Sequence, residues 1–270
     1  MAIRTLNIKG RLTSLNKPLV MGILNVTPDS FYAASRKTDT LSVGKRIEAI
    51  LSEGGEIVDV GGYSTRPDAA EVSAEEEWKR LEPALKILMK DFPQVTVSVD
   101  TFRADIACRA VEEYGVAIIN DISGGAWDDG MFPAVARLQA PYILTHGGGC
   151  NDGIFEEVLM YFAGKLRELR LMGVNDVIID PGFGFGKTHE QNYELMRRLH
   201  EIKTLTDCPL LVGISRKRMI YNELGCTADE SLNGTTALNT FALLNGADIL
   251  RVHDVKAAVD AVMITEKLKN

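Results

Sequence analysis

The sequence predicts a (β/α)8 TIM barrel preceded by a short N-terminal β-hairpin. Eight short runs rich in Val, Ile and Leu recur along the 270 residues, and each ends in a polar or glycine-rich cluster. Such runs, without clean alternation, are typical of strands buried on both faces of a parallel sheet. Helical patterns fill most of the stretches between them, as this barrel requires. We therefore expect one domain over residues 1–270.

The first expected element is the hairpin, over residues 1–16. Its side chains alternate in the segment IRTLNIKGRLTSL, and Lys9-Gly10 supplies a turn between two short strands. Because the hairpin precedes the first barrel strand, we expect it to close the floor of the barrel.

The eight predicted strands each lead into residues that carry chemistry. In chain order they are Leu19–Leu24 with Asn25, Ile57–Val60 with Gly61-Gly62, Thr96–Val99 with Asp100, Val116–Ile119 with Asn120-Asp121, Tyr142–Leu144 with His146, Val177–Ile179 with Asp180, Leu210–Ile214 with Ser215-Arg216-Lys217, and Ile249–Leu250 with Arg251 and His253. In such barrels the site is built from the carboxyl ends of the strands, so we expect these end groups to meet at one mouth.

Helices are expected between the strands. They are predicted over Ser42–Glu53, Ser73–Asp91, Arg103–Tyr114, Met131–Leu138, Ile154–Met172, Glu190–Ile202, Met219–Glu223, Leu232–Asn245 and Val255–Leu268. Ser73, with Glu76 three residues later, predicts a capping box at the second of these helices.

Composition excludes several classes of function. The net charge of -7 argues against sequence-independent nucleic-acid binding, which needs a basic face. No apolar run reaches the ~18 residues that span a bilayer, and the N-terminus lacks the apolar core of a signal peptide. We therefore expect a cytoplasmic protein without a membrane partner. The four cysteines, Cys108, Cys150, Cys208 and Cys226, show no C-x-x-C spacing and are expected to be free thiols.

Three of the strand ends could together recognise a heterocycle rich in N–H groups. Asp100, Asn120 and Asp180 follow the third, fourth and sixth strands. A carboxylate accepts two hydrogen bonds from the ring N–H and exocyclic amine of an aminopyrimidine, and a buried carboxylate without such a partner is costly. The alternative is that some of these groups cap helices, a role for which Asp121 with Ser123 is better suited than Asn120.

Other strand ends suit anions or a metal. Asn25 could ligate Mg²⁺ or contact a phosphate, although ordinary turn chemistry is the alternative. After the second strand, DVGGYSTRP offers the hydroxyls of Ser64 and Thr65 and the guanidinium fork of Arg66, and Asp59 within that strand could point into the barrel. A surface loop with one arginine would look the same.

The last two strand ends are basic. GISRKR places Ser215, Lys217 and Arg218 beside a possible helix N-terminus, which suits a carboxylate or carbonyl oxygen. Arg251 and His253 are two residues apart and share one side of an extended segment, so they could bind phosphate. A solvated basic pair is the alternative reading.

The segment DPGFGFGKT is no nucleotide motif. Pro181 stands where a Walker A pattern needs glycine, and the glycine spacing also fails the dinucleotide fingerprint. We expect its glycines to keep a loop low over the barrel mouth, with Phe183 or Phe185 as an apolar wall for a flat ligand.

Seven motifs in order, MGILNVTPDSF, DVGGYSTRP, SVDT, INDISGG, DPGFGFGKT, GISRKR and RVHDV, resemble the dihydropteroate synthase family, from about Pro18 to His253. The resemblance implies a (β/α)8 barrel, usually a homodimer, that is inhibited by sulfonamides. It implies the condensation of p-aminobenzoate with 6-hydroxymethyl-7,8-dihydropterin pyrophosphate to give 7,8-dihydropteroate and pyrophosphate, with Mg²⁺.

The resemblance also implies roles for individual residues. The pterin would be held by Asp100, Asn120, Asp180, Gly213 and Lys217, with Phe185 nearby and Arg251 against its face. Pyrophosphate and Mg²⁺ would be handled by Thr65, Arg66, Arg251, His253 and Asn25, the last as metal ligand. Phe31, Pro67 and Ser215 would surround p-aminobenzoate. The catalytic set would be Asn25, Arg66, Asp100, Lys217, Arg251 and His253.

One segment departs from the family pattern. After the fifth strand, THGGGCNDGIFEEV is shorter by several residues and lacks the family's Met and Gly-Thr-Pro signature. Two alternatives follow: a pterin- or folate-binding barrel that is no synthase, such as a folate-dependent methyltransferase-like domain, and a non-catalytic paralogue. The first would not be expected to carry both STRP and RVHDV as a pyrophosphate clamp.

Overall fold

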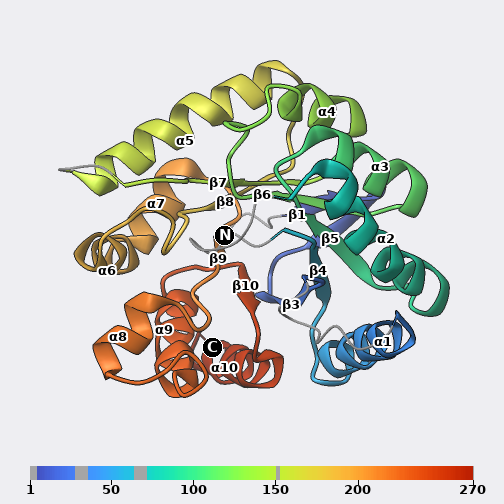
Figure 1. The fold of residues 1–270 in the computed structure, drawn as a ribbon. Coiled ribbons are helices and arrows are strands. Elements are labelled where there is room, and N and C mark those ends of the chain that lie inside the picture. Colours follow the sequence, from blue (N-terminus) through green and yellow to red (C-terminus); the bar gives the residue numbers. More distant parts are fainter. Residues whose placement is uncertain (1–4, 28–35, 64–71, 150–152, 270) are drawn as a thin grey trace.

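The computed structural model describes residues 5–27, 36–63, 72–149 and 153–269, and it contains the predicted barrel (Figure 1). Its parallel strands are β3 (Leu19–Asn25), β4 (Ile57–Gly61), β5 (Thr96–Asp100), β6 (Ile118–Asp121), β7 (Tyr142–Thr145), β8 (Val177–Asp180), β9 (Leu211–Val212) and β10 (Ile249–Val252). They pair in the order β8-β7-β6-β5-β4-β3-β10-β9. A bridge between Ile179 and Leu210 links β8 to β9, so the sheet nearly closes on itself. Strand β9 is only two residues long, whereas the sequence predicts a strand of five residues over Leu210–Ile214.

Helices surround the strands on the outside (Figure 1). They are α1 (Arg36–Ser52), α2 (Ala74–Asp91), α3 (Ala104–Tyr114), α4 (Met131–Leu138), α5 (Ile154–Leu171), α6 (His189–Arg197), α7 (Leu199–Thr206), α8 (Arg218–Leu224), α9 (Leu232–Leu244) and α10 (Val255–Lys269). Within the described ranges, none of the helices is both long and apolar enough to cross a membrane.

The prediction of one helix over Glu190–Ile202 is wrong, because the chain bends between α6 and α7. Arg198 leaves helical geometry there, with φ −101° and ψ 15°. The bend lets both short helices turn apolar residues inward, since Leu195 on α6 and Ile202 on α7 are fully buried. The periodicity of the sequence could not reveal it, because both pieces keep a helical repeat.

Side-chain hydroxyls start two of the helices. The Ser73 hydroxyl accepts a hydrogen bond from the backbone N–H of Glu76 at 3.2 Å, which is one half of the capping box predicted for the start of α2. The return bond is missing among the described residues, because the Glu76 carboxylate accepts from Arg80 instead. A reciprocal capping box forms at α6, where Thr188 and Gln191 bond each other's backbone N–H groups. The sequence analysis did not identify this second cap.

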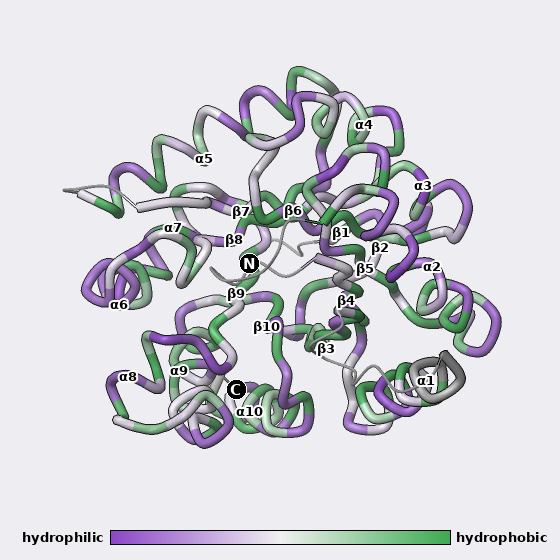
Figure 2. The backbone as a smooth tube through the Cα atoms, in the orientation of Figure 1, coloured by the Kyte–Doolittle hydropathy of each residue, from purple (hydrophilic) through white to green (hydrophobic). Residues whose placement is uncertain are grey.

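Apolar residues fill both faces of the sheet, which explains why the strands do not alternate. One face packs against the helices, through residues such as Val58, Val60 and Val99. Figure 2 shows this as hydrophobic colour along the central strands, with hydrophilic colour toward the outer turns of the helices. The other face points into the barrel, where Ile57, Ile118 and other strand residues form a second core.

The N-terminal hairpin packs against this inner core. It consists of β1 (Thr5–Ile8) and β2 (Arg11–Ser14), which pair antiparallel. Lys9 and Gly10 both have positive φ, 51° and 79°, as a two-residue hairpin turn requires. Leu6 is 1% exposed and belongs to the same cluster as Met21, Ile57, Ile118, Ile143, Ile178, Leu211 and Ile249. The hairpin therefore covers the amino-terminal end of the barrel interior.

The barrel interior changes from apolar to polar toward its mouth. Ile57, Ile118, Ile178 and Ile249 belong to the inner core. Since side chains two residues apart on a strand share a face, the next inward positions are Asp59, Asn120, Asp180 and Arg251. The strands thus hold these four polar side chains in one layer above an apolar floor.

Candidate active site at the barrel mouth

A buried ion pair lies at the centre of this polar layer. Arg251 donates from Nε to Asp59 Oδ2 at 2.7 Å and from Nη2 to Asp100 Oδ2 at 2.5 Å. The side chain of Asp59 is fully buried, so a charged hydrogen-bond partner is needed to keep it there. Asn120 Nδ2 also donates to Asp59 Oδ2, at 3.0 Å. Asp59 therefore fixes the orientation of two side chains that the sequence assigned to the site.

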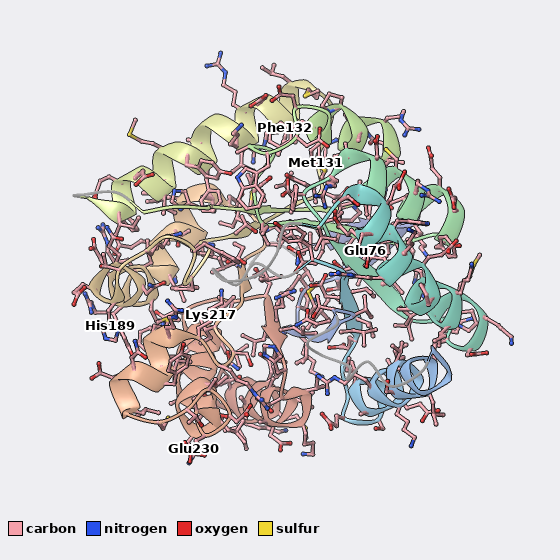
Figure 3. The ribbon with its side chains drawn as sticks, in the orientation of Figure 1. Glu76, Met131, Phe132, His189, Lys217 and Glu230 are labelled. Carbon is pink, nitrogen blue, oxygen red and sulfur yellow. The ribbon has the colours of Figure 1, made fainter. Side chains whose placement is uncertain are left out.

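Asp180 and Lys217 face the same mouth from β8 and from the start of α8. Asp180 Oδ1 accepts a hydrogen bond from the Gly182 backbone N–H at 2.8 Å. Lys217 Nζ donates to the carbonyl of Phe183 and lies 4.5 Å from the centre of the Phe185 ring. Figure 3 labels Lys217 well inside the ring of helices, whereas His189 and Glu230 lie at its rim.

Gly213 keeps space open between these two groups of residues. A Cβ added there would lie 3.9 Å from both Arg251 Cδ and Asp180 Oδ2. The position therefore borders the Arg251 guanidinium arm and the Asp180 carboxylate at once. A flat ligand that contacts both groups would meet no side chain from this position.

Burial shifts the pKa values of these groups toward neutrality. It raises the pKa of Asp100 to about 7, although the Arg251 charge opposes the shift. Burial also raises the pKa of Asp180, against the charge of Lys217, and lowers the pKa of Lys217 to about 8. Burial alone would lower the pKa of Arg251, but the carboxylates of Asp59 and Asp100 raise it. Near pH 7 Asp100 can thus either donate or accept a hydrogen bond.

A cavity of about 340 Å³ adjoins the mouth at the ends of β3 and β10. Asn25 and His253 are among the residues that line it. His253 Nδ1 lies 3.1 Å from Ser215 Oγ, and its backbone N–H donates to the same oxygen. Burial, together with the charges of Arg251 and Arg216, lowers the pKa of His253 to about 4. The imidazole is therefore neutral at pH 7.

The loop DPGFGFGKT is held by its own lysine. Lys187 Nζ donates to the carbonyls of His146 and Gly182 at 2.9 Å and to that of Phe185 at 3.4 Å. The lysine thus serves the loop itself, in keeping with the rejection of a nucleotide motif. Phe183 is fully buried in the outer core, so Phe185, half-buried beside Lys217, is the aromatic residue at the mouth.

The alternative role of the carboxylates as helix caps is not realised. Asp121 accepts hydrogen bonds from the backbone N–H groups of Ser123 at 2.7 Å and Gly125 at 2.8 Å, and from the Tyr142 hydroxyl at 2.7 Å. It organises the turn after β6 rather than the start of a helix. Asn120 bonds Asp59 instead.

The structure brings most of the proposed site residues together. Those at the mouth or in the adjoining cavity are Asn25, Asp100, Asn120, Asp180, Phe185, Gly213, Ser215, Lys217, Arg251 and His253. Phe31, Ser64, Thr65, Arg66, Pro67 and Cys150 lie outside the described residues. Two contributors had no role in the sequence analysis. The sequence predicts only an inward direction for Asp59, without a role in the site. Arg46, which lines the cavity from α1, has no motif to mark it.

A magnesium ion fits the chemistry of the cavity if a phosphate group supplies part of its ligands. In the part of the chain that the structure describes, no three His, Cys, Asp or Glu side chains cluster as a metal site. Mg²⁺ is often bound by one or two protein oxygens, with phosphates and water completing its shell. The amide of Asn25 offers one such oxygen, Oδ1. This oxygen lies beside Gly61, which has no side chain, and a Cβ added to Gly61 would come within 3.4 Å of it. The residues present therefore fit a metal that arrives with a phosphate group.

Comparisons with known proteins give one consistent family. The model of the pterin binding enzyme family matches residues 21–253. The dihydropteroate synthase of Escherichia coli strain K12 is 39% identical over 269 residues, which cover 96% of this chain and 94% of that protein. Two solved structures of the Xanthomonas albilineans dihydropteroate synthase are also similar. The one with 4-aminobenzoic acid has a TM-score of 0.92 at 34% identity, covering 99% of both chains. The one with 7,8-dihydropteroate has a TM-score of 0.89 at 32% identity, covering 98% of this chain and 99% of that chain.

Proposed function

This chain belongs to the dihydropteroate synthase family of pterin binding enzymes, and we propose that it joins p-aminobenzoate to 6-hydroxymethyl-7,8-dihydropterin pyrophosphate. The products are 7,8-dihydropteroate and pyrophosphate. The reaction is an alkyl transfer, and the enzyme is accordingly a transferase of folate biosynthesis.

The observation that carries this function is the polar layer at the mouth, in which Asp180 lies across Gly213 from Arg251. In the proposal Asp180 accepts hydrogen bonds from the ring N–H and exocyclic amine of the pterin. Lys217 donates to the pterin carbonyl, and the Arg251 guanidinium lies against the ring face. Because Asp59 takes the amide nitrogen of Asn120, the amide oxygen remains to accept a further pterin N–H.

The chemical step needs little from the protein beyond positioning and charge stabilisation. The bond between the pterin methylene carbon and the pyrophosphate oxygen breaks, and the pyrophosphate leaves with the electron pair. The electron-rich pterin stabilises the resulting cation, the aniline nitrogen attacks the methylene carbon, and the nitrogen then loses a proton to solvent. No side chain has to act as a general base. The protein contributes orientation and stabilisation of the growing negative charge.

The leaving group is assigned to the end of β3 and the region of β10. Asn25 and His253 line one cavity there. Arg251, on β10, lies two positions before His253 in the sequence. Thr65 and Arg66 are assigned to the same group on the family resemblance. Asn25 would hold Mg²⁺, which when bound neutralises charge on the pyrophosphate. Neutral His253 can donate one hydrogen bond to a phosphate oxygen.

The second substrate is assigned to the outer side of the same mouth. Ser215 is buried, and its hydroxyl is hydrogen-bonded to His253. We therefore assign it an indirect role, in which it shapes the loop after β9 against which p-aminobenzoate would bind. Phe31 and Pro67 are assigned to this subsite on the family resemblance. We also propose, on that resemblance and on composition, one domain over residues 1–270, a homodimer and a cytoplasmic location.

A turnover assay tests the proposal. Purified protein with Mg²⁺ should release pyrophosphate and form 7,8-dihydropteroate when both substrates are present, and neither product when one is omitted. Pterin binding without any pyrophosphate release would favour a non-synthase barrel or a non-catalytic paralogue instead. The oligomeric state is checked separately, by light scattering on the eluted protein.

A further inference from the structure

Arg46, on α1, lines the cavity at the ends of β3 and β10. It shares the cavity wall with Asn25 and His253, and with Arg216 and Asp254. Because the leaving group of the proposed reaction carries several negative charges, the uncompensated positive charges on this wall determine how well it is held. Among the described residues of this wall, Arg46 differs from the other basic side chains in its partners.

The charge of Arg216 is already compensated. Its Nε and Nη2 donate to the two oxygens of Asp254 at 3.0 and 2.7 Å, and its Nη1 donates to Asp229 at 2.6 Å. A guanidinium forked between two carboxylates has little attraction left for a further anion. The same contacts also occupy the carboxylate of Asp254.

Arg251 and His253 bring no net positive charge either. Arg251 pairs with the carboxylates of Asp59 and Asp100. The pKa of His253 lies at about 4, because of burial and the neighbouring arginines, so its imidazole is neutral at pH 7. Both residues can still donate hydrogen bonds to an anion.

Arg46 differs from them in its partners. Its Nη2 donates to two backbone carbonyls, that of His253 at 2.6 Å and that of Ile23 at 3.4 Å. In the described ranges it forms no ion pair with a carboxylate, and its Nε and Nη1 have no acceptor. Burial lowers the pKa of Arg46, yet a guanidinium stays charged. Its direct hydrogen-bond partners are carbonyls, while the carboxylates of Glu53 and Asp254 act on it through space without forming an ion pair. An anion in the cavity could therefore pair with this half-buried cation directly.

We infer that Arg46 is a binding residue for the pyrophosphate leaving group, with its Nε and Nη1 edge facing the cavity. The inference rests on the proposed function, which supplies the anion. The two carbonyl contacts tether the guanidinium between the ends of β3 and β10, so the fork is held in place before the anion arrives. Its charge then stabilises the oxygen that gains charge as the methylene carbon departs.

Binding of inorganic pyrophosphate with Mg²⁺ tests this inference, measured by calorimetry on the full chain. Arg46→Met should weaken pyrophosphate binding at least tenfold, and should leave binding of 6-hydroxymethylpterin, which lacks phosphate, within twofold of the parent. Arg46→Gln is a second variant in case Arg46→Met does not fold, because it keeps an N–H donor for the His253 carbonyl. It should show the same loss of pyrophosphate affinity. Arg137→Met is the matched control, because Arg137 is an exposed arginine paired with Glu112, and both affinities should be unchanged.

Two results would overturn the inference, and a third would separate it from the synthase activity. Pyrophosphate affinity within twofold of the parent in a folded Arg46 variant would overturn the inference. A parent protein that binds no pyrophosphate would overturn it as well. A parent that binds pyrophosphate through Arg46 but forms no dihydropteroate would leave the inference standing and overturn the synthase activity alone.

Discussion

Replacing Asp59 by Asn removes the buried charge that anchors the centre of the site. The Asp59 side chain is fully buried, and one of its oxygens accepts hydrogen bonds from both Arg251 and Asn120. Its other oxygen has no partner in the described structure, so the amide nitrogen of Asn can occupy that position without displacing a donor. Asp59→Asn therefore keeps size and both contacts, and changes the charge.

The expected loss follows from the contacts that weaken. A hydrogen bond to a charged group contributes about 1.5–3 kcal/mol and a neutral one about 1 kcal/mol. Arg251 keeps its second partner, Asp100, and about a fifth of its side-chain surface is exposed. The substitution therefore leaves no buried charge without a partner. We expect the free energy of unfolding to fall by about 1–2 kcal/mol, roughly 2–6 °C in Tm for a chain of this size. Since the Asp59 charge helps to raise the pKa of Asp100, that pKa should also fall.

Urea unfolding followed by circular dichroism measures the first effect, and the pH dependence of pterin binding measures the second. Asp260→Asn is the control, because Asp260 is an exposed carboxylate paired with Lys256 and should change stability by less than about 0.5 kcal/mol. If Asp59→Asn is as stable as this control and leaves the pH profile of binding unmoved, Asp59 is no anchor and the reasoning fails.

Three further predictions concern neighbouring groups. Asp180→Asn turns one acceptor into a donor that faces donors, at a cost of about 1–3 kcal/mol, and calorimetry with a phosphate-free pterin should show at least a tenfold loss of affinity. Arg251→Lys cannot reach both Asp59 and Asp100 as the fork does, so turnover should fall more than tenfold, and a rate within twofold of the parent would contradict the fork's role. The pKa of Asp100 is about 7 when folded, against 3.8 for the free group, so its stability contribution is complete below about pH 3.8 and is lost as pH rises through 7. Asp100→Asn should remove this decline, which urea midpoints between pH 4 and 8 would reveal.

The barrel and the strand ends could be predicted because both depend on local patterns. Buried parallel strands need continuous apolar runs, and the site of a barrel needs polar residues where those runs end. This is why Asp100, Asn120, Asp180 and Arg251 were found from the sequence and lie together at the mouth. The role of Asp59 was not found, because it depends on a partner 192 positions away in the chain.

Other features depend on geometry that no pattern records. Phe183 and Phe185 are two residues apart in one loop, and only the path of the backbone sends the first into the core and the second to Lys217. Arg46 lies in the middle of α1, where an arginine is typical of a solvated face. Its contacts with the carbonyls of Ile23 and His253 depend on how that helix packs against the barrel.

The three carbonyl contacts of Lys187 have a consequence for the thermodynamics of ligand binding. They hold the segment after β8 in its final shape in the free protein. A ligand that packs against Phe185 therefore meets a wall that is already ordered, and little conformational entropy is lost there on association. We expect the entropic cost of pterin recognition to come from the ligand and from displaced water, rather than from this part of the chain.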